Sequence, residues 1–254
     1  MRRFFVEKIP ATEGLVTISG REARHITRVL RMGPGDHFVL LDQRGLRYQV
    51  VIQSVRQGNV MVLLERPLPA PSTSPVDMFI GQALLKSSAM DVMIQKTTEL
   101  GVNSIHPFLS QRTVVRPRAD KRGNRVKRWQ DIAIAASKQS DRTRPPHIMP
   151  VVSFAELLQT PFPKQTLKII LWEEEQSRDL KSLLRSTLVQ AKAVLALVGP
   201  EGGFSRQEIS LAQEAGFLSV SLGPHILRAE TAAIAVAVIL GYESINPEGE
   251  ETAT

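Results

Sequence analysis

The chain of 254 residues is 43% hydrophobic and 22% charged, which is typical of an ordinary globular protein. Because it contains no cysteine, disulfide bonds, thiolate nucleophiles and cysteine-based metal sites are excluded, and a reducing, cytoplasmic location is expected. Its formal net charge of +7 favours a polyanionic partner, most often nucleic acid, over a basic surface that serves only solubility.

The N-terminal part of the chain, residues 1–70, is predicted to form a small β-barrel with one helix. Its first residues, MRRFFVEKIP, lack the apolar segment of a secretory signal. β-Rich runs are expected to form strands at 37–42, 47–55 and 59–65, because glycine-containing turns separate them.

A helix expected from about Ser19 to Leu30 has a row of arginines opposite an apolar face. The spacings of 3, 4 and 3 residues would stack the guanidinium groups on one side of an α-helix. The row is Arg21, Arg24, Arg28 and Arg31, and the apolar face is Ala23, Ile26, Val29 and Leu30. Stacked like charges repel one another unless an anion lies opposite, so these arginines are predicted to contact nucleic acid.

Strands alternate with helices from Val76 onwards, after a linker-like segment, RPLPAPSTSP (66–75), that marks the predicted domain boundary. Strands are expected at 76–85, 104–109, 166–173, 193–199 and 217–223, and helices at 87–101, at 124–140 and after Ser205. This alternation implies a mostly parallel sheet covered on both faces, in a second domain of residues 76–245. The polar residues 246–254 are expected to form a flexible tail.

The first helix of this domain is expected to be capped by Ser88 and Asp91 and to end at Gly101. The longest apolar run of the chain, from Ala232 to Leu240, is far shorter than the roughly 20 residues that span a bilayer. It is therefore predicted to be a buried helix.

A second basic cluster lies at 112–128, where eight basic residues are interrupted by a single acidic one, Asp120. Four of these residues join the predicted RNA contacts: Arg112, Arg116, Arg122 and Arg125. Because aromatic residues make up only 5% of the chain, contacts to phosphates are expected rather than a platform for stacking bases.

The motif LVGPEGGFS (197–205) joins an apolar strand to a helix through a loop rich in glycine and proline. Ser205 and Glu208 have the spacing of a capping box, which fixes the start of the helix. The segment 194–223 is therefore predicted to be a compact βαβ unit with two parallel strands.

Both strands of this unit leave the sheet through a Gly-Pro pair, as LVGP (197–200) and SLGP (221–224). Ligands of open α/β sheets bind outside the carboxyl ends of the strands, and a third exit, LWEEE (171–175), is expected at the same edge. The three exits predict a pocket rich in backbone donors and acceptors. A tight structural connection is the alternative interpretation of the loop.

The sequence around these exits excludes two common nucleotide sites, because neither a Walker motif nor a dinucleotide fingerprint is present. The exits lack a lysine but have carboxylates nearby, in Glu173, Glu201 and Glu230, which favours a cationic or neutral ligand over a triphosphate. The five histidines have no metal-ligand spacing, so no metal is expected, and no Ser/His/Asp motif occurs. A cofactor is therefore expected to supply the reactive group.

Two segments, LVGPEGGFSRQEISLAQEAGF (197–217) and VSLGPHILRAETAAIAV (220–236), together resemble the C-terminal signature of the SPOUT (trefoil-knot) methyltransferases. The chain most resembles the RsmE-type 16S rRNA uridine-N3 methyltransferases, over nearly its whole length. HITRVLRMGPGD (25–36) fits the N-terminal RNA-binding barrel of that family, and KRWQDIAIAASKQSDR (127–142) fits its middle.

The resemblance implies an α/β fold: a SPOUT trefoil-knotted, mostly parallel sheet domain with a small N-terminal PUA-like β-barrel. It implies S-adenosyl-L-methionine (SAM) as cofactor, a homodimer with the active site at its interface, and 16S rRNA of the 30S ribosomal subunit as partner. The cofactor-binding positions that it implies are Leu171, Glu173, Leu197, Gly199, Pro200, Glu201, Gly202, Leu222, Gly223, Ile226, Leu227 and Thr231.

The function so implied is SAM-dependent methylation of N3 of a specific uridine in the decoding region of 16S rRNA. Arg228 is predicted to stabilise the uridine anion or orient the base. Glu230 is predicted to accept a hydrogen bond or a proton, unless it only caps the helix that starts there. The alternatives are a non-catalytic basic RNA-binding or ribosome-assembly module and a related knotted tRNA methyltransferase. The chain departs from the family pattern at Lys138, Asp141 and His225.

Overall fold

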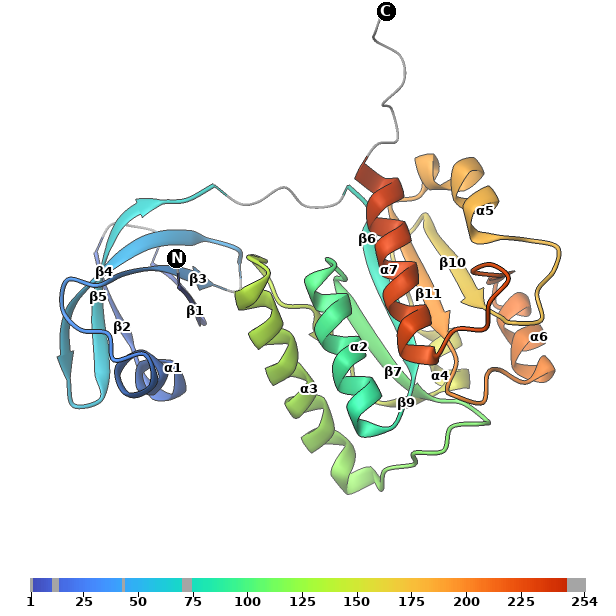
Figure 1. The fold of residues 1–254 in the computed structure, drawn as a ribbon, viewed down its shortest axis with the longest axis horizontal. Helices are drawn as coiled ribbons and strands as arrows, with labels where there is room; N and C mark the ends of the chain where they lie inside the picture. Colours follow the sequence, from blue (N-terminus) through green and yellow to red (C-terminus); the bar gives the residue numbers. More distant parts are fainter. Residues whose placement is uncertain (1, 11–13, 43, 70–74, 246–254) are drawn as a thin grey trace, which may run out of the picture. The chain divides into compact units, whose positions relative to one another are not determined.

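The computed structural model describes residues 2–10, 14–42, 44–69 and 75–245, and the chain divides into two compact units (Figure 1). The first unit is Met1–Ser72 with Ser137–Pro145, and the second is Thr73–Ala136 with Pro146–Thr254. The segment Ser137–Pro145 thus groups with the first unit, although the sequence pattern assigns it to the second domain. The predicted tail, 246–254, and residues 70–74 of the predicted linker lie outside the described residues.

The first unit is built on a curled five-stranded sheet with the strand order β1-β3-β4-β5-β2. Its strands are β1 (Arg3–Val6), β2 (Leu15–Ile18), β3 (His37–Asp42), β4 (Arg47–Arg56) and β5 (Asn59–Pro67). The three predicted strands are confirmed as β3, β4 and β5, whereas β1 and β2 have too few residues to show a clear alternation. Alternate side chains of the strands, with Phe4, Phe38 and Leu40 among them, form the apolar core of this unit.

The predicted helix of the first unit is wrong in its second half. It is α-helical only in α1 (Gly20–Arg24) and continues as a π-helix, η1 (His25–Val29), in which the Leu30 N–H donates to the His25 carbonyl at 3.0 Å. The wider π turn ends the α-helical phase, so Val29 is 68% exposed instead of packed against the core. Arg31 lies beyond the helix with φ 53°, and the four arginines do not form one α-helical face.

Ion pairs hold the segment Ser137–Pro145 to the rest of the first unit. The Lys138 ammonium lies 2.6 Å from the Glu22 carboxylate. The Asp141 carboxylate pairs with Arg3 at 2.6 Å and with Arg47 at 2.7 Å. Two of the chain's departures from the family pattern, Lys138 and Asp141, therefore both serve this attachment, and Asp141 does so with φ 60°, in a conformation that aspartate tolerates better than most residues.

The second unit is built on a parallel sheet with the strand order β12-β10-β11-β6-β7-β8, in which β9 also pairs with β7. Its strands are β6 (Asp77–Ala83), β7 (Ser104–Leu109), β8 (His147–Ile148), β9 (Val152–Ser153), β10 (Thr166–Leu171), β11 (Ala193–Val198) and β12 (Leu218–Val220). The prediction of a mostly parallel sheet is confirmed. The central strand β11 is buried along its whole length, as expected of a strand covered on both faces.

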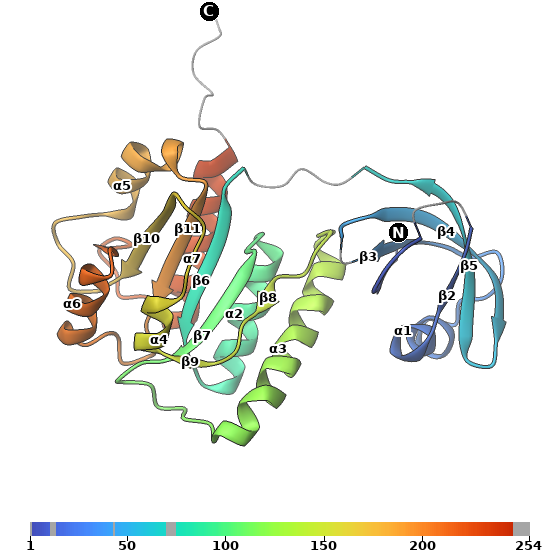
Figure 2. The ribbon, with the colours of Figure 1, turned by 180° about the vertical axis from the view of Figure 1, so that it is seen from behind.

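Helices cover both faces of this sheet and enclose two apolar cores (Figures 1 and 2). The helices are α2 (Ser87–Glu99), α3 (Ala119–Gln139), α4 (Phe154–Gln159), α5 (Leu180–Thr187), α6 (Arg206–Glu214) and α7 (Ala229–Ile245), with a 3₁₀ turn, η2 (Leu188–Gln190). One core includes residues of α2, α3, α5 and α7, and the other includes residues of α4 and α6. The predicted helix is confirmed as α7, but it is only partly buried, since Val238 within it is 47% exposed. No helix among the described residues is both long and apolar enough to cross a membrane.

The start of α2 differs from its prediction. Its N-cap is Lys86, without a side-chain hydrogen bond, rather than a box formed by Ser88 and Asp91. The Lys86 N–H donates instead to the carboxylate of Glu201, at 3.2 Å. A residue from a distant loop thus satisfies a donor at the start of the helix, which local spacing could not indicate. The predicted stop is confirmed, because the residue after the C-cap, Gly101, has φ 98°.

Candidate active site

The three predicted strand exits lie at one edge of the parallel sheet. Strand β10 lies between β11 and β12 and pairs with both in parallel, so all three chains leave the sheet in the same direction. A cavity of about 600 Å³ opens at this edge, which is within the usual range for small-molecule sites. Its walls are the three exit loops and the N-terminal ends of α2 and α7.

The first wall is the loop that follows β11. A turn closes it, in which the Gly203 N–H donates to the Pro200 carbonyl at 2.9 Å, and Gly203 has φ 67°. The predicted capping box is confirmed: the Ser205 side chain accepts from the Glu208 N–H, and the Glu208 carboxylate accepts from the Ser205 N–H at 2.9 Å. Phe204 is buried against the rings of Phe108 and Phe154, which anchors the end of the loop in the core.

The second wall is the segment between β12 and α7, which the chain after β10 supports. The Trp172 N–H donates to the Val220 carbonyl at 3.0 Å. Ser221 then exchanges two backbone hydrogen bonds of 3.0 Å with the segment that precedes α5, donating to Arg178 and accepting from Leu180. Gly223 follows with φ 119°, a conformation open mainly to glycine. Backbone hydrogen bonds therefore tie the chain after β10 to the chain after β12.

A carboxylate beneath this wall adds a pH-dependent support. The Glu175 side chain accepts hydrogen bonds from the Ser177 side chain, the Ser219 hydroxyl and the Ser177 N–H. These bonds favour the charged form and lower the pKa of Glu175 to about 2, with the Ser177 hydroxyl as the largest cause.

Lowering the pH should weaken this support in a definite range. Because the folded pKa of Glu175 is depressed, its stabilising effect is complete above the ordinary pKa of about 4.5 and is lost as the pH falls towards about 2. We expect Glu175→Gln to flatten the decline of the unfolding midpoint between about pH 5 and about pH 2. Asp42, Glu156 and Asp179 also have lowered pKa values, so the difference between wild type and variant is the measured quantity. If the unfolding midpoints of wild type and variant fell in parallel with pH, Glu175 would not contribute to the pH dependence of stability.

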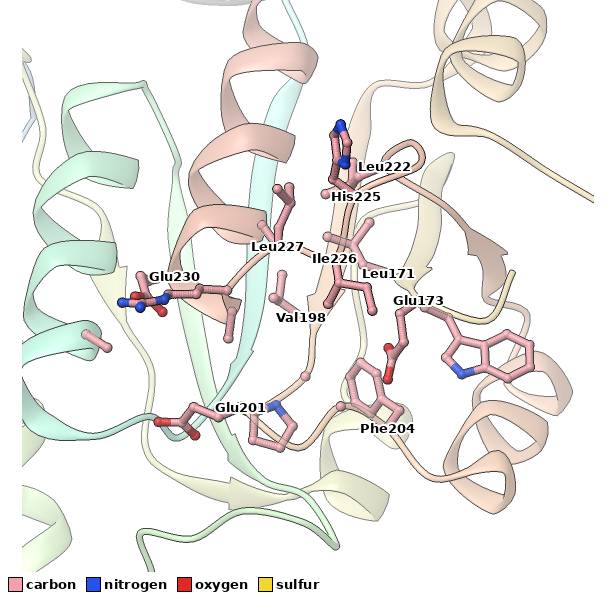
Figure 3. Close-up of a pocket in the computed structure, with 18 of the residues that line it drawn as sticks. Leu171, Glu173, Val198, Glu201, Phe204, Leu222, His225, Ile226, Leu227 and Glu230 are labelled. Atoms are coloured by element: carbon pink, nitrogen blue, oxygen red, sulfur yellow. The ribbon is translucent and has the colours of Figure 1, made fainter. Parts of the chain in front are cut away.

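Charged side chains lie on opposite sides of the cavity. Figure 3 shows Glu201 and Glu230 towards α2 and Glu173 across from them beside Phe204. Lys86 and Arg228 also line the cavity. The expectation of a pocket without lysine is therefore wrong, because Lys86 comes from the connection between a fourth strand, β6, and α2. Carboxylates still outnumber the long cationic side chains in the lining.

Two of these carboxylates have identifiable structural roles. Glu201 accepts from the N–H of Lys86 at the start of α2. Glu230 lies in the first turn of α7, where a negative charge is favourable because of the helix dipole. Glu173 adjoins Gly203 so closely that a Cβ atom there would be 2.1 Å from its Oε1 atom.

Most of the predicted cofactor-binding and catalytic residues line this one cavity. They are Leu171, Glu173, Gly199, Pro200, Glu201, Leu222, Gly223, Ile226, Leu227, Arg228 and Glu230. Leu197 lies outside the lining because it is fully buried in β11, where it packs in the core. Gly202 has its carbonyl turned to Arg112, and Thr231 is exposed on α7. The structure does not place these three residues in the cavity wall.

The cavity also has lining residues that were not among the predicted site residues. They are Lys86, Ser88, Ala89, Trp172, Val198, Gly203, Phe204, Ser221, Pro224, His225, Ala229 and Ala232. Lys86, Ser88 and Ala89 follow β6, and the rule that ligands bind beyond the carboxyl ends of parallel strands could have found them. The same rule could also have predicted the other residues of the exit loops, which are neighbours of the predicted residues.

The residues predicted to contact RNA divide between the two units. Arg21, Arg24, Arg28 and Arg31 are all exposed in the first unit. In the second unit Arg112 and Arg116 are exposed, and Arg122 and Arg125 are half-buried. Arg112 donates to the Gly202 carbonyl at 2.9 Å, so part of its hydrogen-bonding capacity serves the cavity loop. No group of three or more metal-ligating side chains occurs in the part of the chain that the structure describes.

Comparisons with known proteins agree with this architecture. A family model described as an RNA methyltransferase domain matches residues 72–241, and one described as an RNA methyltransferase PUA domain matches residues 18–60. A Bacillus subtilis protein named ribosomal RNA small subunit methyltransferase E is 32% identical over 99% of this chain and 100% of its own length.

Two solved structures are similar over nearly the whole chain. The ribosomal RNA small subunit methyltransferase E of Neisseria gonorrhoeae, bound to SAM, has a TM-score of 0.86 and 29% identity, covering 95% of this chain and 97% of that one. A Legionella pneumophila methyltransferase structure, in complex with SAM, has a TM-score of 0.85 and 31% identity, covering 94% and 96%.

Proposed function

The chain belongs to the ribosomal RNA small subunit methyltransferase E family, and from this we propose that it methylates N3 of one uridine in the decoding region of 16S rRNA. It is a SAM-dependent RNA methyltransferase with the predicted SPOUT α/β domain and an N-terminal PUA domain. The position of the methyl group, the decoding region and the cytoplasmic location are proposed here in addition to the RNA methylation that the family shows.

The observation that supports catalysis best is the cavity at the shared strand edge. Its residues fit SAM: backbone groups of two Gly-Pro exits can bind the adenosine and methionine parts, and the carboxylates of Glu173, Glu201 and Glu230 suit a ligand with cationic groups. The volume of about 600 Å³ suits a ligand of that size. An RNA-binding module without catalytic activity would not need a pocket lined by these backbone groups and carboxylates.

Uridine N3 becomes a nucleophile only when its proton leaves, so the chain must stabilise the resulting anion. When bound, SAM supplies the electrophilic methyl group. Arg228 lies in the cavity wall where the last exit loop meets α7, and its guanidinium can donate to a uridine carbonyl oxygen as negative charge develops there. Arg228 is therefore proposed to be the residue that stabilises the anion or holds the base in place.

Glu230 is proposed to accept a hydrogen bond or a proton from the base. It lines the cavity two residues after Arg228 and is half-buried in the first turn of α7. A carboxylate and a guanidinium two residues apart in the cavity wall are a suitable pair for an N–H substrate.

RNA is proposed to contact arginines of both units through its phosphates, with the target base turned out of its stack to reach the cavity. The residues concerned are Arg21, Arg24, Arg28, Arg31, Arg112, Arg116, Arg122 and Arg125. The family and the net charge of +7 both support a polyanionic substrate.

The double substitution Arg24→Ala with Arg28→Ala is expected to weaken RNA binding and its salt dependence together. Each phosphate contact that is lost should reduce the slope of log K against log salt by about one, so the pair should reduce it by about two. Fluorescence anisotropy with a 16S rRNA fragment over a salt series measures this slope. An unchanged slope would show that these arginines do not contact the RNA.

A homodimer with the active site at its interface is also part of the proposal. Helix α7 of the second unit exposes large apolar side chains, with Tyr242 77% and Val238 47% exposed. Val92 of the neighbouring helix α2 is 44% exposed. Apolar groups gathered on two packed helices are typical of a surface that another protein surface covers.

The experiment that tests the function is methyl transfer from labelled SAM to RNA of a strain without the enzyme, followed by identification of the nucleoside. Label in N3-methyluridine of 16S rRNA is expected. Label in tRNA would favour the knotted tRNA methyltransferase, and absence of label would favour the RNA-binding module. SAM at about 100 times its Kd should also add about 2.7 kcal/mol to the free energy of unfolding.

A further inference from the structure

Gln82 is a polar side chain in an otherwise apolar part of the sheet. It lies at the carboxyl end of β6, between Gly81 and Ala83, and none of it is exposed. In the parallel ladder it lies opposite Val198, the last residue of β11. A buried amide at the end of a central strand is costly unless its hydrogen bonds are made.

The side-chain N–H groups of Gln82 point to the beginning of the cavity loop. The Nε2 atom lies 3.1 Å from the Gly199 carbonyl oxygen and 3.4 Å from that of Val198, and 3.0 Å from the carbonyl of Ala83. Val198 and Gly199 both line the cavity. Gln82 itself is behind the lining, so its effect on the cavity passes through these two backbone groups.

The other side of this amide is unused within the protein. The Oε1 atom of Gln82 is buried and has no hydrogen-bond partner among the residues that the structure describes. An apolar side chain at this position would avoid leaving a buried acceptor without a partner. The gain that compensates for this cost is therefore on the Nε2 side, in the bonds to the loop.

Further groups fix the rest of the same loop. The Gly203 N–H holds the Pro200 carbonyl, Arg112 holds the Gly202 carbonyl, and the Glu201 carboxylate holds the N–H of Lys86. Gln82 completes the set at the point where the loop leaves the sheet. Since a peptide group is planar and trans, fixing the Val198 carbonyl also fixes the direction of the Gly199 N–H.

We propose that Gln82 is a positioning residue for the cofactor: it sets the peptide groups of Val198 and Gly199 so that the loop after β11 has the shape that binds SAM. This inference rests on the proposed function. It assigns no contact between Gln82 and the reacting atoms, so the affinity for SAM should depend on it far more than the rate at saturating SAM.

The test compares Gln82→Met, which keeps the length of the side chain but removes its donors, with a matched variant, Gln130→Met. Gln130 lies in α3 away from the cavity lining and also makes two backbone hydrogen bonds, to Pro146 and from Ile148. Calorimetry gives the Kd for SAM, steady-state kinetics give KM and kcat, and thermal unfolding gives Tm.

We expect Gln82→Met to raise the Kd and the KM for SAM about tenfold or more, with kcat within about threefold of wild type. Gln130→Met should lower Tm comparably and leave the Kd within about twofold. An unchanged Kd in Gln82→Met, or an equal loss of affinity in both variants, would overturn the proposal. Failure of the wild-type protein to bind SAM would instead overturn the proposed function.

A second variant, Gln82→Glu, keeps the proposal testable if the methionine variant folds poorly. Its carboxyl group can donate to the loop carbonyls only when protonated, and burial favours that form. SAM affinity relative to wild type is expected to rise as the pH is lowered from about 8.5 to about 6. An equally weak affinity at both pH values would show that the donated hydrogen bond is not what matters.

Discussion

Replacing Arg228 by alanine is expected to lower the rate of methyl transfer about a hundredfold or more, while the Kd for SAM stays within about threefold of wild type. The guanidinium is proposed to meet negative charge that exists only as the uridine loses its proton, and a single donor of this kind contributes about 10²–10³ in rate. The loss should therefore appear in kcat and not in cofactor binding.

Single-turnover methylation of 16S rRNA by the variant, beside calorimetry with SAM, measures the two quantities separately. Arg206→Ala is the matched control, because Arg206 is an exposed arginine paired with Glu174 and lies outside the cavity lining. It should retain wild-type rates. Full activity of Arg228→Ala would remove Arg228 from the mechanism, and a large loss of SAM affinity would make it a cofactor-binding residue instead.

The second large effect is expected from Gly203→Ala. Gly203 has φ 67°, and a Cβ atom at this position would approach Glu173 Oε1 to 2.1 Å. The Glu173 side chain can move away, so the fold should persist, but its carboxylate would leave its place in the cavity wall. We expect the Kd for SAM to rise about tenfold or more.

Gly216→Ala provides the control that separates backbone strain from the cavity effect. Gly216 follows α6 with φ 85°, and apart from its chain neighbours no described residue lies within 4 Å of the position of a Cβ atom there. Both variants should lose about 1–2 kcal/mol of stability from the left-handed backbone conformation. Only Gly203→Ala should lose SAM affinity; equal affinities in the two variants would refute the role of this approach to Glu173.

Local sequence patterns identified the strand exits that form the cavity. The capping box of Ser205 and Glu208, and Gly101 after the end of α2, require only neighbours in the chain, and the structure confirms them. The alternation of strands and helices implied a parallel sheet, and parallel pairing places the carboxyl ends of β10 and β11 at the same edge. The knot is different. Knots are so rare that they are excluded by default when a fold is inferred from residue patterns, so only the resemblance to a family implied one here.

Two of the predictions that failed concern the start of one helix and the continuation of another. The start of α2 was assigned to its own side chains, but Glu201, a residue of a distant loop, accepts its free donor. The π turn after Arg24 also has no signature in helical spacing, and it separates Arg28 and Arg31 from the predicted face. At the start of α2 a tertiary contact therefore takes the place of the local cap.

The sequence by itself determined the α/β fold class of the second domain, the basic character of the chain and the pair of Gly-Pro exits at one sheet edge, because these depend on composition, period and local turn chemistry. Only the tertiary structure decided which groups complete the site. Lys86 lines the cavity from the start of α2, and Gln82 reaches the loop after β11 across the sheet. Those contacts join residues more than 100 positions apart in the chain, and no local pattern encodes which distant side chain will fill a given place in a packed core.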